Sequence, residues 1–354
     1  MRQMQPDDGI EPRAMIISSV EGIDDRRRTA MQWRKLLLSG GAALGAAAAF
    51  NAVATKAVPP LENLIGGDDD DFLWRGHRVS YTRRGDGPPV LLVHSLHAAA
   101  SSYEWRFVVD ALAEQHTVYT LDLVGFGRSA RPNARYTARF YIGLIGDFAA
   151  QVIGEPCALI ATSLSAAYAI VLGARDPGRF PALVLIEPTG LVRLHEAPGT
   201  GGDTARLAFE TPVIGTSMFN ALVSRRALGY FLDRIYCDAS LVTAELIDHY
   251  YQTAHQPGAK HAPSAFVAGH LNLDVRRALR RLAQPALLVW GDQAREAPVE
   301  EARGFIAVKP DFEVAIFEHV GDLPHDERPE EFTDVVRSFL ARVFSPNTGI
   351  EAKA

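Results

Sequence analysis

The stretch LIATSLSAAYA, residues 159–169, places a serine between an apolar run typical of a buried strand and a run of small residues typical of a helix. On such a sharp turn, Ser163 would expose its hydroxyl above the sheet, with the helix N-terminus beneath it. The turn is crowded, and the flanking Ala161 and Ser165 are small. A hydroxyl held in this way can act as a nucleophile. The alternative interpretation is that Ser163 only caps the helix that follows.

A nucleophilic serine needs a base whose pKa lies near neutrality, and histidine is the usual choice. The C-terminal stretch HVGDLPHDERPEEF, residues 319–332, contains His319 and His325. Another chemically active side chain, Glu187, ends the apolar stretch ALVLIEP. An unpaired carboxylate is costly at the end of an apolar strand, so we expect Glu187 to have a partner.

The elements that would position these residues follow from the alternation of apolar runs and helical patterns. After a hairpin-like stretch at 76–85, we expect strands at 89–94, 117–123, 157–163, 182–188, 285–292 and 312–318. Continuous apolar strands alternating with helices predict an α/β fold, a mostly parallel sheet with helices on both faces. The alternation stops at 189–281. This break predicts a helical cap inserted after the strand at 182–188, which is strand 6 when the two strands of the hairpin are counted first.

The domain limits that follow are a core of 61–188 and 282–345, a cap of 189–281 and a tail of 346–354. Residues 1–60 contain Arg34 and Lys35, an uncharged run at 36–55 and an A-x-A site, which together predict a signal peptide or membrane anchor. The protein would then be exported or membrane-associated, or cytoplasmic if the start is misassigned. Residues 58–72 are rich in Pro, Gly and Asp and predict a linker, so the folded core would begin near Leu73.

Composition excludes several partners. The net charge is −6 and no long basic run occurs, which argues against nucleic acid. The two cysteines and the absence of CxxC spacing predict neither a disulfide framework nor a metal site, and we expect no cofactor. Aromatic residues and histidines gather in the cap, but their spacing matches no metal site: Tyr250, Tyr251, His255, His261 and His270.

Four further motifs resemble the α/β-hydrolase superfamily and occur in its order. They are VLLVHSLHAAASSYEWR (90–106), TLDLVGFGRSARP (120–132), RLAQPALLVWGDQ (281–293) and LPHDERPEEF (323–332). The resemblance covers about 73–343. It implies that Ser163 is a nucleophile and that the backbone N–H groups of Leu96 and Leu164 form an oxyanion hole. His94 would anchor its loop.

Two residues that the resemblance implies are missing. The usual acid position after strand 7 holds Ala294, and the usual histidine position holds Asp322. Some superfamily members, notably haloalkane dehalogenases, carry the acid after strand 6, where Glu187 lies; Asp292 is a weaker candidate. His325 lies about one helical turn beyond Asp322 and is the expected base, ahead of His319.

The function expected on this basis is that of a serine hydrolase, an esterase acting on a hydrophobic small molecule, with Ser163, His325 and Glu187 as its triad. Two alternatives are non-hydrolytic lyase or cyclase chemistry, with Asp322 in a new role, and a non-catalytic binding protein. Dehalogenase activity is disfavoured because that chemistry uses an aspartate nucleophile, whereas the turn holds Ser163.

Overall fold

The computed structural model describes residues 44–53, 58–199 and 201–344 of the chain. The chain divides into two units, Met1–Ala52 and Val53–Ala354, and the second contains the sheet. A helix is present at 44–53, and most of the predicted signal or anchor segment lies outside the described residues. Among the residues that are described, no helix combines the length and the apolar character needed to cross a membrane.

One sheet of eight strands organises the larger unit, in the order β1-β2-β4-β3-β5-β6-β7-β8. β2 is antiparallel to both of its neighbours, and every other pair is parallel. The strands are β1 Asp68–Trp74, β2 His77–Arg84, β3 Pro89–Val93, β4 Thr117–Leu121, β5 Ala158–Thr162, β6 Leu183–Ile186, β7 Ala286–Gly291 and β8 Glu313–Phe317.

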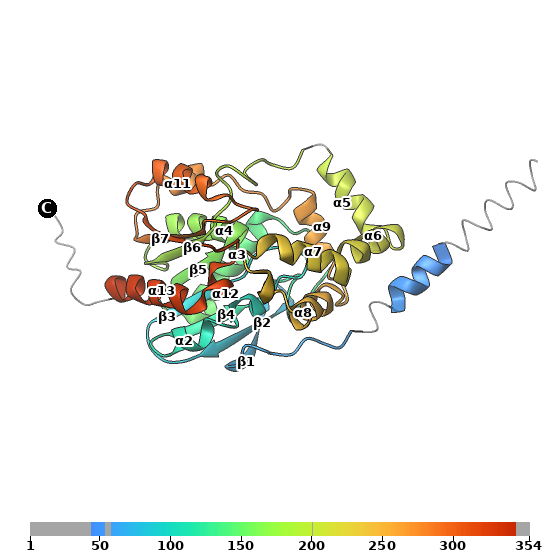
Figure 1. Cartoon of the computed structure of the whole chain (residues 1–354), viewed down its shortest axis with the longest axis horizontal. Helices are drawn as coiled ribbons and strands as arrows, with labels where there is room; N and C mark the ends of the chain where they lie inside the picture. The colour runs from blue at the N-terminus through green and yellow to red at the C-terminus, as the bar shows by residue number, and fades with distance from the viewer. Residues whose placement is uncertain (1–43, 54–57, 200, 345–354) are drawn as a thin grey trace, which may run out of the picture. The chain divides into compact units, whose positions relative to one another are not determined.

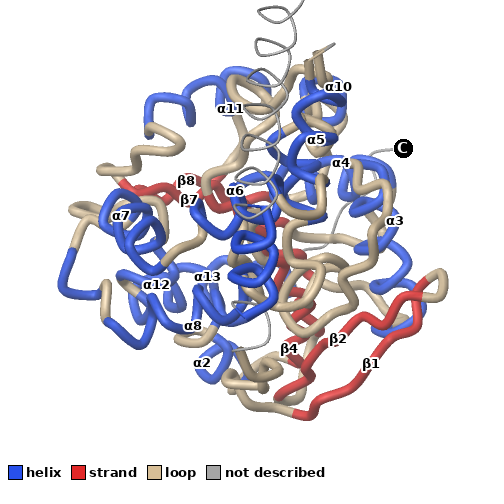
Figure 2. Tube along the Cα trace, turned by 90° about the vertical axis from the view of Figure 1, so that its right-hand side faces the viewer, coloured by secondary structure: helices blue, strands red, loops and turns tan. Residues whose placement is uncertain are grey.

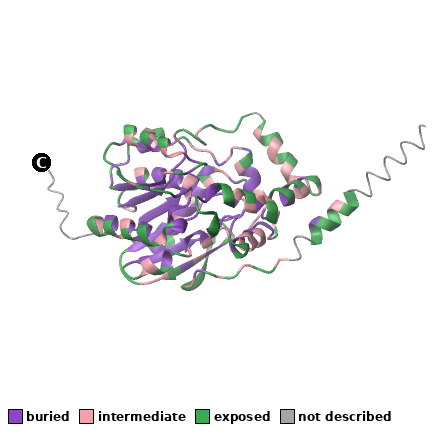
Figure 3. Cartoon of the chain, in the orientation of Figure 1, coloured by how far each residue is buried: buried purple, intermediate pink, exposed green. Residues whose placement is uncertain are grey.

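The central strands β3, β5, β6 and β7 are buried along their whole length, which explains their continuous apolar sequences. Helices α3, α4 and α11 pack on one face, while α2 and α13 pack on the other (Figures 1 and 3). These helices are α2 Val109–Ala113, α3 Ala138–Phe148, α4 Ser163–Arg175, α11 Ala302–Val308 and α13 Pro329–Phe344. The predicted α/β fold is confirmed.

The segment between β6 and β7 contains helices and no strand among its described residues. Its helices are α5 Gly202–Glu210, α6 Ile214–Leu222, α7 Arg225–Ile235, α8 Ala244–Ala254, α9 His261–Val267 and α10 Arg276–Leu279. Helices α6, α7 and α8 lie on the viewer's side of the strands in Figure 2. A separate apolar cluster joins them to Ala99 and Leu323 of the core. The insertion after strand 6 is therefore a helical cap, as predicted.

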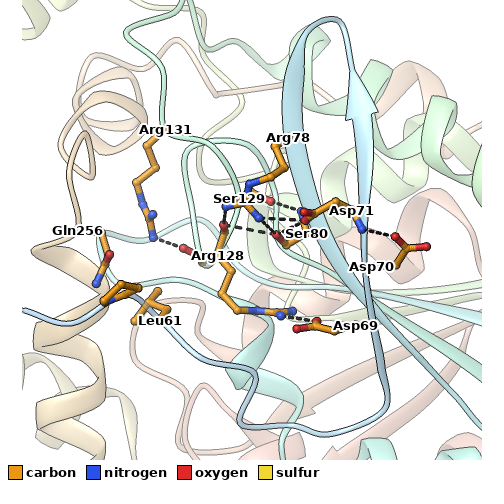
Figure 4. A pocket seen from close by; sticks show the side chains of 12 residues that line it. Leu61, Asp69, Asp70, Asp71, Arg78, Ser80, Arg128, Ser129, Arg131 and Gln256 are labelled. Atoms are coloured by element: carbon orange, nitrogen blue, oxygen red, sulfur yellow. Dashed lines mark hydrogen bonds and ion pairs between the residues drawn. The ribbon is translucent and has the colours of Figure 1, made fainter.

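The prediction of a linker over 58–72 is wrong for its last residues, because β1 begins at Asp68. β1 is an edge strand, where charged residues are tolerated because they face solvent. Figure 4 shows how its aspartates are held: Asp71 accepts hydrogen bonds from Arg78 and Ser80, and Asp69 forms an ion pair with Arg128. The Asp-rich sequence hid a strand that is stabilised by Arg78 and Ser80 in the next strand and by Arg128 far along the chain.

The loop after β4 positions the turn that precedes α2. The Asp122 carboxylate accepts hydrogen bonds from the backbone N–H groups of Ser102 (2.7 Å) and Arg128 (3.0 Å). Gly127 has φ of 48°, and a Cβ added there would overlap the Asp122 carboxylate, so only glycine fits. Through Ser102, this loop fixes the short helix η1, Ser102–Trp105, which carries Glu104 into the core.

Deleting the N-terminal residues tests where the folded core begins. A chain of residues 58–354 should unfold cooperatively at the same temperature as the full chain. A chain of residues 73–354 should unfold at least about 5 °C lower, because it loses most of β1 and with it the ion pairs of Asp71 with Arg78 and of Asp69 with Arg128. Calorimetry measures both values. Equal midpoints for the two chains would show that β1 adds nothing to stability.

Candidate functional site

A cavity of about 290 Å³ lies at the carboxyl ends of β5 and β6, beneath the cap. Ser163, Glu187 and Asp322 border it from the core, and Phe231 and Phe266 border it from cap helices α7 and α9. A somewhat larger cavity of about 320 Å³ lies beside β1 (Figure 4), but its lining aspartates and arginines largely pair with one another. The Ser163 cavity combines apolar walls with chemically active side chains, as ligand sites usually do.

Ser163 has the backbone conformation of a nucleophile turn. Its φ is 49°, a region that residues other than glycine rarely adopt. Helix α4 begins at Ser163 itself and Thr162 holds the N-cap position, so the alternative that Ser163 only caps the helix is wrong. The hydroxyl of Ser165 donates to the carbonyl of His94 at 2.6 Å, which ties this turn to the loop after β3.

The two expected oxyanion-hole residues lie next to the hydrogen bond between Ser165 and His94. One is on the helix side of that bond and the other is on the loop side. Leu164 follows Ser163 in the first turn of α4, where backbone N–H groups have no partner within the helix. Leu96 borders the cavity from the loop after β3. His94 anchors that loop, since its Nε2 accepts from Leu123 N–H at 3.1 Å and its Nδ1 lies 2.6 Å from the Ser95 carbonyl. The oxyanion hole itself stays a prediction.

Glu187 and Asp322 form a pair of carboxyl groups. Glu187 is 4 % exposed, has φ of 45° and accepts a hydrogen bond from Gly291 N–H at 3.2 Å. Burial raises the pKa of Glu187 well above its usual range, and the charge and hydrogen bond of Asp322 raise it further. Burial also raises the pKa of Asp322. The partner expected for Glu187 is therefore a second carboxyl group.

The two carboxyl groups are not equivalent. Asp322 accepts hydrogen bonds from three backbone N–H groups, those of Arg295 (3.1 Å), Glu296 (2.8 Å) and Ala297 (3.2 Å). Such donors stabilise a carboxylate, whereas Glu187 has one backbone donor. We therefore assign the resting charge to Asp322 and the shared proton to Glu187. Two coupled acids of this kind titrate in two steps that belong to the pair.

His325 does not take the orientation expected of it. It lies on α12, Pro324–Glu327, is 1 % exposed and packs against Trp105 and Phe332. Its Nε2 lies 3.5 Å from Oε1 of Glu104, and neither ring nitrogen makes a hydrogen bond to Ser163 or Glu187. The expected contact with Glu187 is wrong, because the start of α12 turns the imidazole into the core. The catalytic role of His325 stays a prediction.

Glu104 is the residue that sequence reasoning missed. Its Oε2 accepts from the N–H (3.0 Å) and hydroxyl (2.6 Å) of Ser95, and its Oε1 accepts from the Thr162 hydroxyl at 2.7 Å. Burial would raise the pKa of Glu104, but His325 and these hydrogen bonds outweigh it and lower the value to about 2. The sequence held one signal for Glu104. It is a charged residue inside the motif SSYEWR, between Ser102 and Trp105, which are both buried.

His97 was also missed, although it follows Leu96 directly. It borders the Ser163 cavity, and no other histidine among the described residues does so. The other candidates lie elsewhere: His319 is exposed, and Asp292 accepts from Val320 N–H at 3.3 Å without bordering the cavity. In the cap, His255 stacks on Tyr251, and His261 and His270 pair with Glu210 and Asp203. No cluster of metal ligands occurs among the described residues.

Replacing Ser163 by glycine should stabilise the fold. Glycine adopts a φ of 49° without strain, so Ser163→Gly should raise the free energy of unfolding by about 1 kcal/mol. Ser163→Ala keeps the strain and should give no such gain. Urea denaturation measures both. A glycine variant that is no more stable than the alanine variant would contradict the strain.

The carboxyl pair should make stability depend on pH. Because the folded-state pKa of Glu187 is raised, the folded chain holds more protons than the unfolded chain above about pH 4.3. Stability should then fall as pH rises from about 4 towards the raised pKa, and Glu187→Gln should remove this fall. Exposed Glu300→Gln is the matched control. Urea denaturation from pH 4 to 9 measures the difference, and parallel curves for the parent and Glu187→Gln would contradict the pairing.

Residues 90–335 match the model of the alpha/beta hydrolase family. A 2-hydroxy-6-oxo-6-(2'-aminophenyl)hexa-2,4-dienoic acid hydrolase of Metapseudomonas resinovorans is 27% identical over 75% of this chain and 89% of its own. The 2-hydroxymuconate semialdehyde hydrolase of a Pseudomonas species is 25% identical over 77% of this chain and 93% of its own. A serine hydrolase involved in carbazole degradation has a similar fold, with a TM-score of 0.65, 24% identity and coverage of 77% and 98%. The chain belongs to the alpha/beta hydrolase family.

Proposed function

We propose that the protein is a serine hydrolase that cleaves an ester of an apolar small molecule. Ser163 would attack the carbonyl carbon and form an acyl-enzyme, which water then hydrolyses. The observation that carries the proposal is that the strained Ser163 borders the same cavity as Glu187 and Asp322. Strain of this kind is retained where it serves a site, and the apolar walls suit an apolar substrate.

The base in this proposal is the carboxyl pair, because Asp322 occupies the family's histidine position and borders the cavity. With one shared proton the pair is a weak base. When the second proton leaves, two like charges in a buried site repel each other, and accepting the serine proton relieves that repulsion. Activity should therefore rise with pH through the raised pKa of the pair. In this scheme Glu187 makes Asp322 a stronger base.

The alternative base is His325, as the sequence predicts. From its buried place, with Nε2 3.5 Å from Glu104, it would act through Glu104 and through Thr162, whose hydroxyl donates to the same carboxylate. A histidine base would give an acid limb that disappears when His325 is replaced, because a protonated imidazole cannot accept the serine proton. The two proposals for the base therefore make different predictions. The acid limb of the pH profile should depend on Glu187 and Asp322 in the first proposal and on His325 in the second.

A second kind of bond is also a candidate for cleavage. The names of two relatives describe hydrolases of a hydroxy-oxo-dienoic acid and a muconate semialdehyde. A carbon–carbon bond beside a carbonyl group is thus the second choice, and it would use the same Ser163 cavity. Non-hydrolytic acid–base chemistry is a separate candidate. The Glu187–Asp322 pair favours it, because such a pair can hold and return a proton without any nucleophile.

Labelling with a fluorophosphonate probe and turnover of 4-nitrophenyl butyrate test the proposal. The parent should be labelled and active, and Ser163→Ala should lose both. Asp322→Asn should lower turnover by about 100-fold or more, because it removes the proton acceptor. Asp292→Asn is the matched control, since that carboxyl group lies outside the cavity.

The pH profiles then separate the bases. Glu187→Gln should shift the acid limb to lower pH, and His325→Gln should leave its shape unchanged. Loss of the limb in His325→Gln alone would assign the base to His325. Absence of labelling in the parent would favour the acid–base or binding alternatives.

A further inference from the structure

His97 lies where two cavities meet. The Ser163 cavity and a second, apolar cavity of about 200 Å³ share His97 and Phe231 as lining residues. Cap side chains such as Phe209, Phe219 and Leu228 line the second cavity. If the apolar part of a ligand fills the second cavity, the bond that joins it to the rest of the ligand would lie beside the imidazole of His97. A molecule that fills both cavities therefore passes His97.

The hydrogen bonding of His97 determines its tautomer. The backbone N–H of Ala99 donates to Nδ1 of His97 at 3.2 Å. A ring nitrogen that accepts a hydrogen bond carries no proton, so the neutral ring carries its proton on Nε2. Burial lowers the pKa of His97 to about 4, against the opposing charge of Glu104, so the ring is neutral at pH 7.

The ring is also held in place. It stacks on Tyr250 with ring centroids 5.4 Å apart and an interplanar angle of 16°, and Phe231 lies 5.8 Å away. Nδ1 is occupied by the backbone N–H of Ala99, which leaves Nε2 as the ring nitrogen that can meet a ligand. This Nε2–H makes no hydrogen bond to a described residue. His97 therefore offers a fixed, neutral donor from a ring that borders the cavity containing Ser163.

We propose that Nε2–H of His97 donates a hydrogen bond to the carbonyl oxygen of a substrate whose apolar acyl group occupies the cap cavity. This inference rests on the proposed function. The carbonyl oxygen becomes negative when Ser163 attacks, and a donor held in a water-poor site stabilises that charge. His97 cannot be the base, because its Nδ1 is occupied and its Nε2 already carries a proton. It would act beside the N–H groups of Leu96 and Leu164.

Nuclear magnetic resonance tests the donor without any turnover. In protein labelled with ¹⁵N-histidine, the His97 ring should remain the neutral Nε2–H tautomer from pH 5 to 8. Adding an octyl trifluoromethyl ketone should shift the Nε2–H resonance in the parent and in Ser163→Ala. A ring that titrates between pH 6 and 7, or that carries its proton on Nδ1, would overturn the proposal. A hydrolase without activity could still pass this test, so its outcome is separate from that of the proposed function.

Kinetics test the role. His97→Ala should lower kcat for 4-nitrophenyl octanoate by about 100-fold and leave KM within a few-fold, and His97→Gln should recover part of the loss. His97→Ala should also reduce the preference for the ester over its thionoester. Sulfur accepts hydrogen bonds poorly, so the thionoester gains less from the His97 donor in the parent. His249→Ala is the matched control: this ring also has its pKa lowered to about 4 and stacks on Tyr103, but it borders neither cavity.

Other results would count against His97 as a donor. An increase in KM alone would mean that His97 only packs against the acyl group. Loss of the acid limb of the pH profile in His97→Gln would make it the base instead. Full activity in Ser163→Ala would instead refute the proposed function, and the magnetic resonance result would still decide the state of His97.

Discussion

The buried carboxylate of Glu104 joins three segments of the core. It accepts hydrogen bonds from Ser95 in the loop after β3 and from Thr162 at the end of β5, and it faces His325 on α12. A buried charge is tolerated only when it is paired and hydrogen-bonded, so all three segments must meet correctly. Glu104 thus contacts both the loop that carries Leu96 and the strand end that leads to Ser163, and the hydrogen bond from Ser165 to His94 joins the same two segments.

This network includes His325, which lies about one helical turn beyond the position where the family usually carries its histidine. His325 packs between aromatic rings and Glu104, where its imidazole can hold α12 against the sheet. The cavity receives carboxyl groups in its place, Glu187 from the end of β6 and Asp322 from the loop after β8. Two acids side by side titrate together, and their shared proton gives the cavity a different electrostatic character from that of a histidine site.

Backbone strain is concentrated at the same place. Ser163 and Glu187 both have positive φ values, and each ends or directly follows one of the buried central strands. Parallel strands that are packed on both faces supply the rigid frame that keeps such conformations occupied. The cap has its own apolar cluster, which includes Ala99 and Leu323 of the core, and its helices α9 and α10 also pack into the main core cluster. The rigid parts therefore position the reacting groups, and the cap supplies the apolar walls.

The sequence by itself determined the order of strands and helices, the inserted cap and the turn at Ser163. Each of these is written locally, because runs of buried residues and small residues at a crowded turn are visible in a few consecutive positions. The structure alone decided which charged groups meet: Glu187 with Asp322, Glu104 with His325, and Asp69 of β1 with Arg128. These partners lie far apart along the chain. No local pattern encodes such distances, because the fold of the whole sheet brings the ends of its strands together.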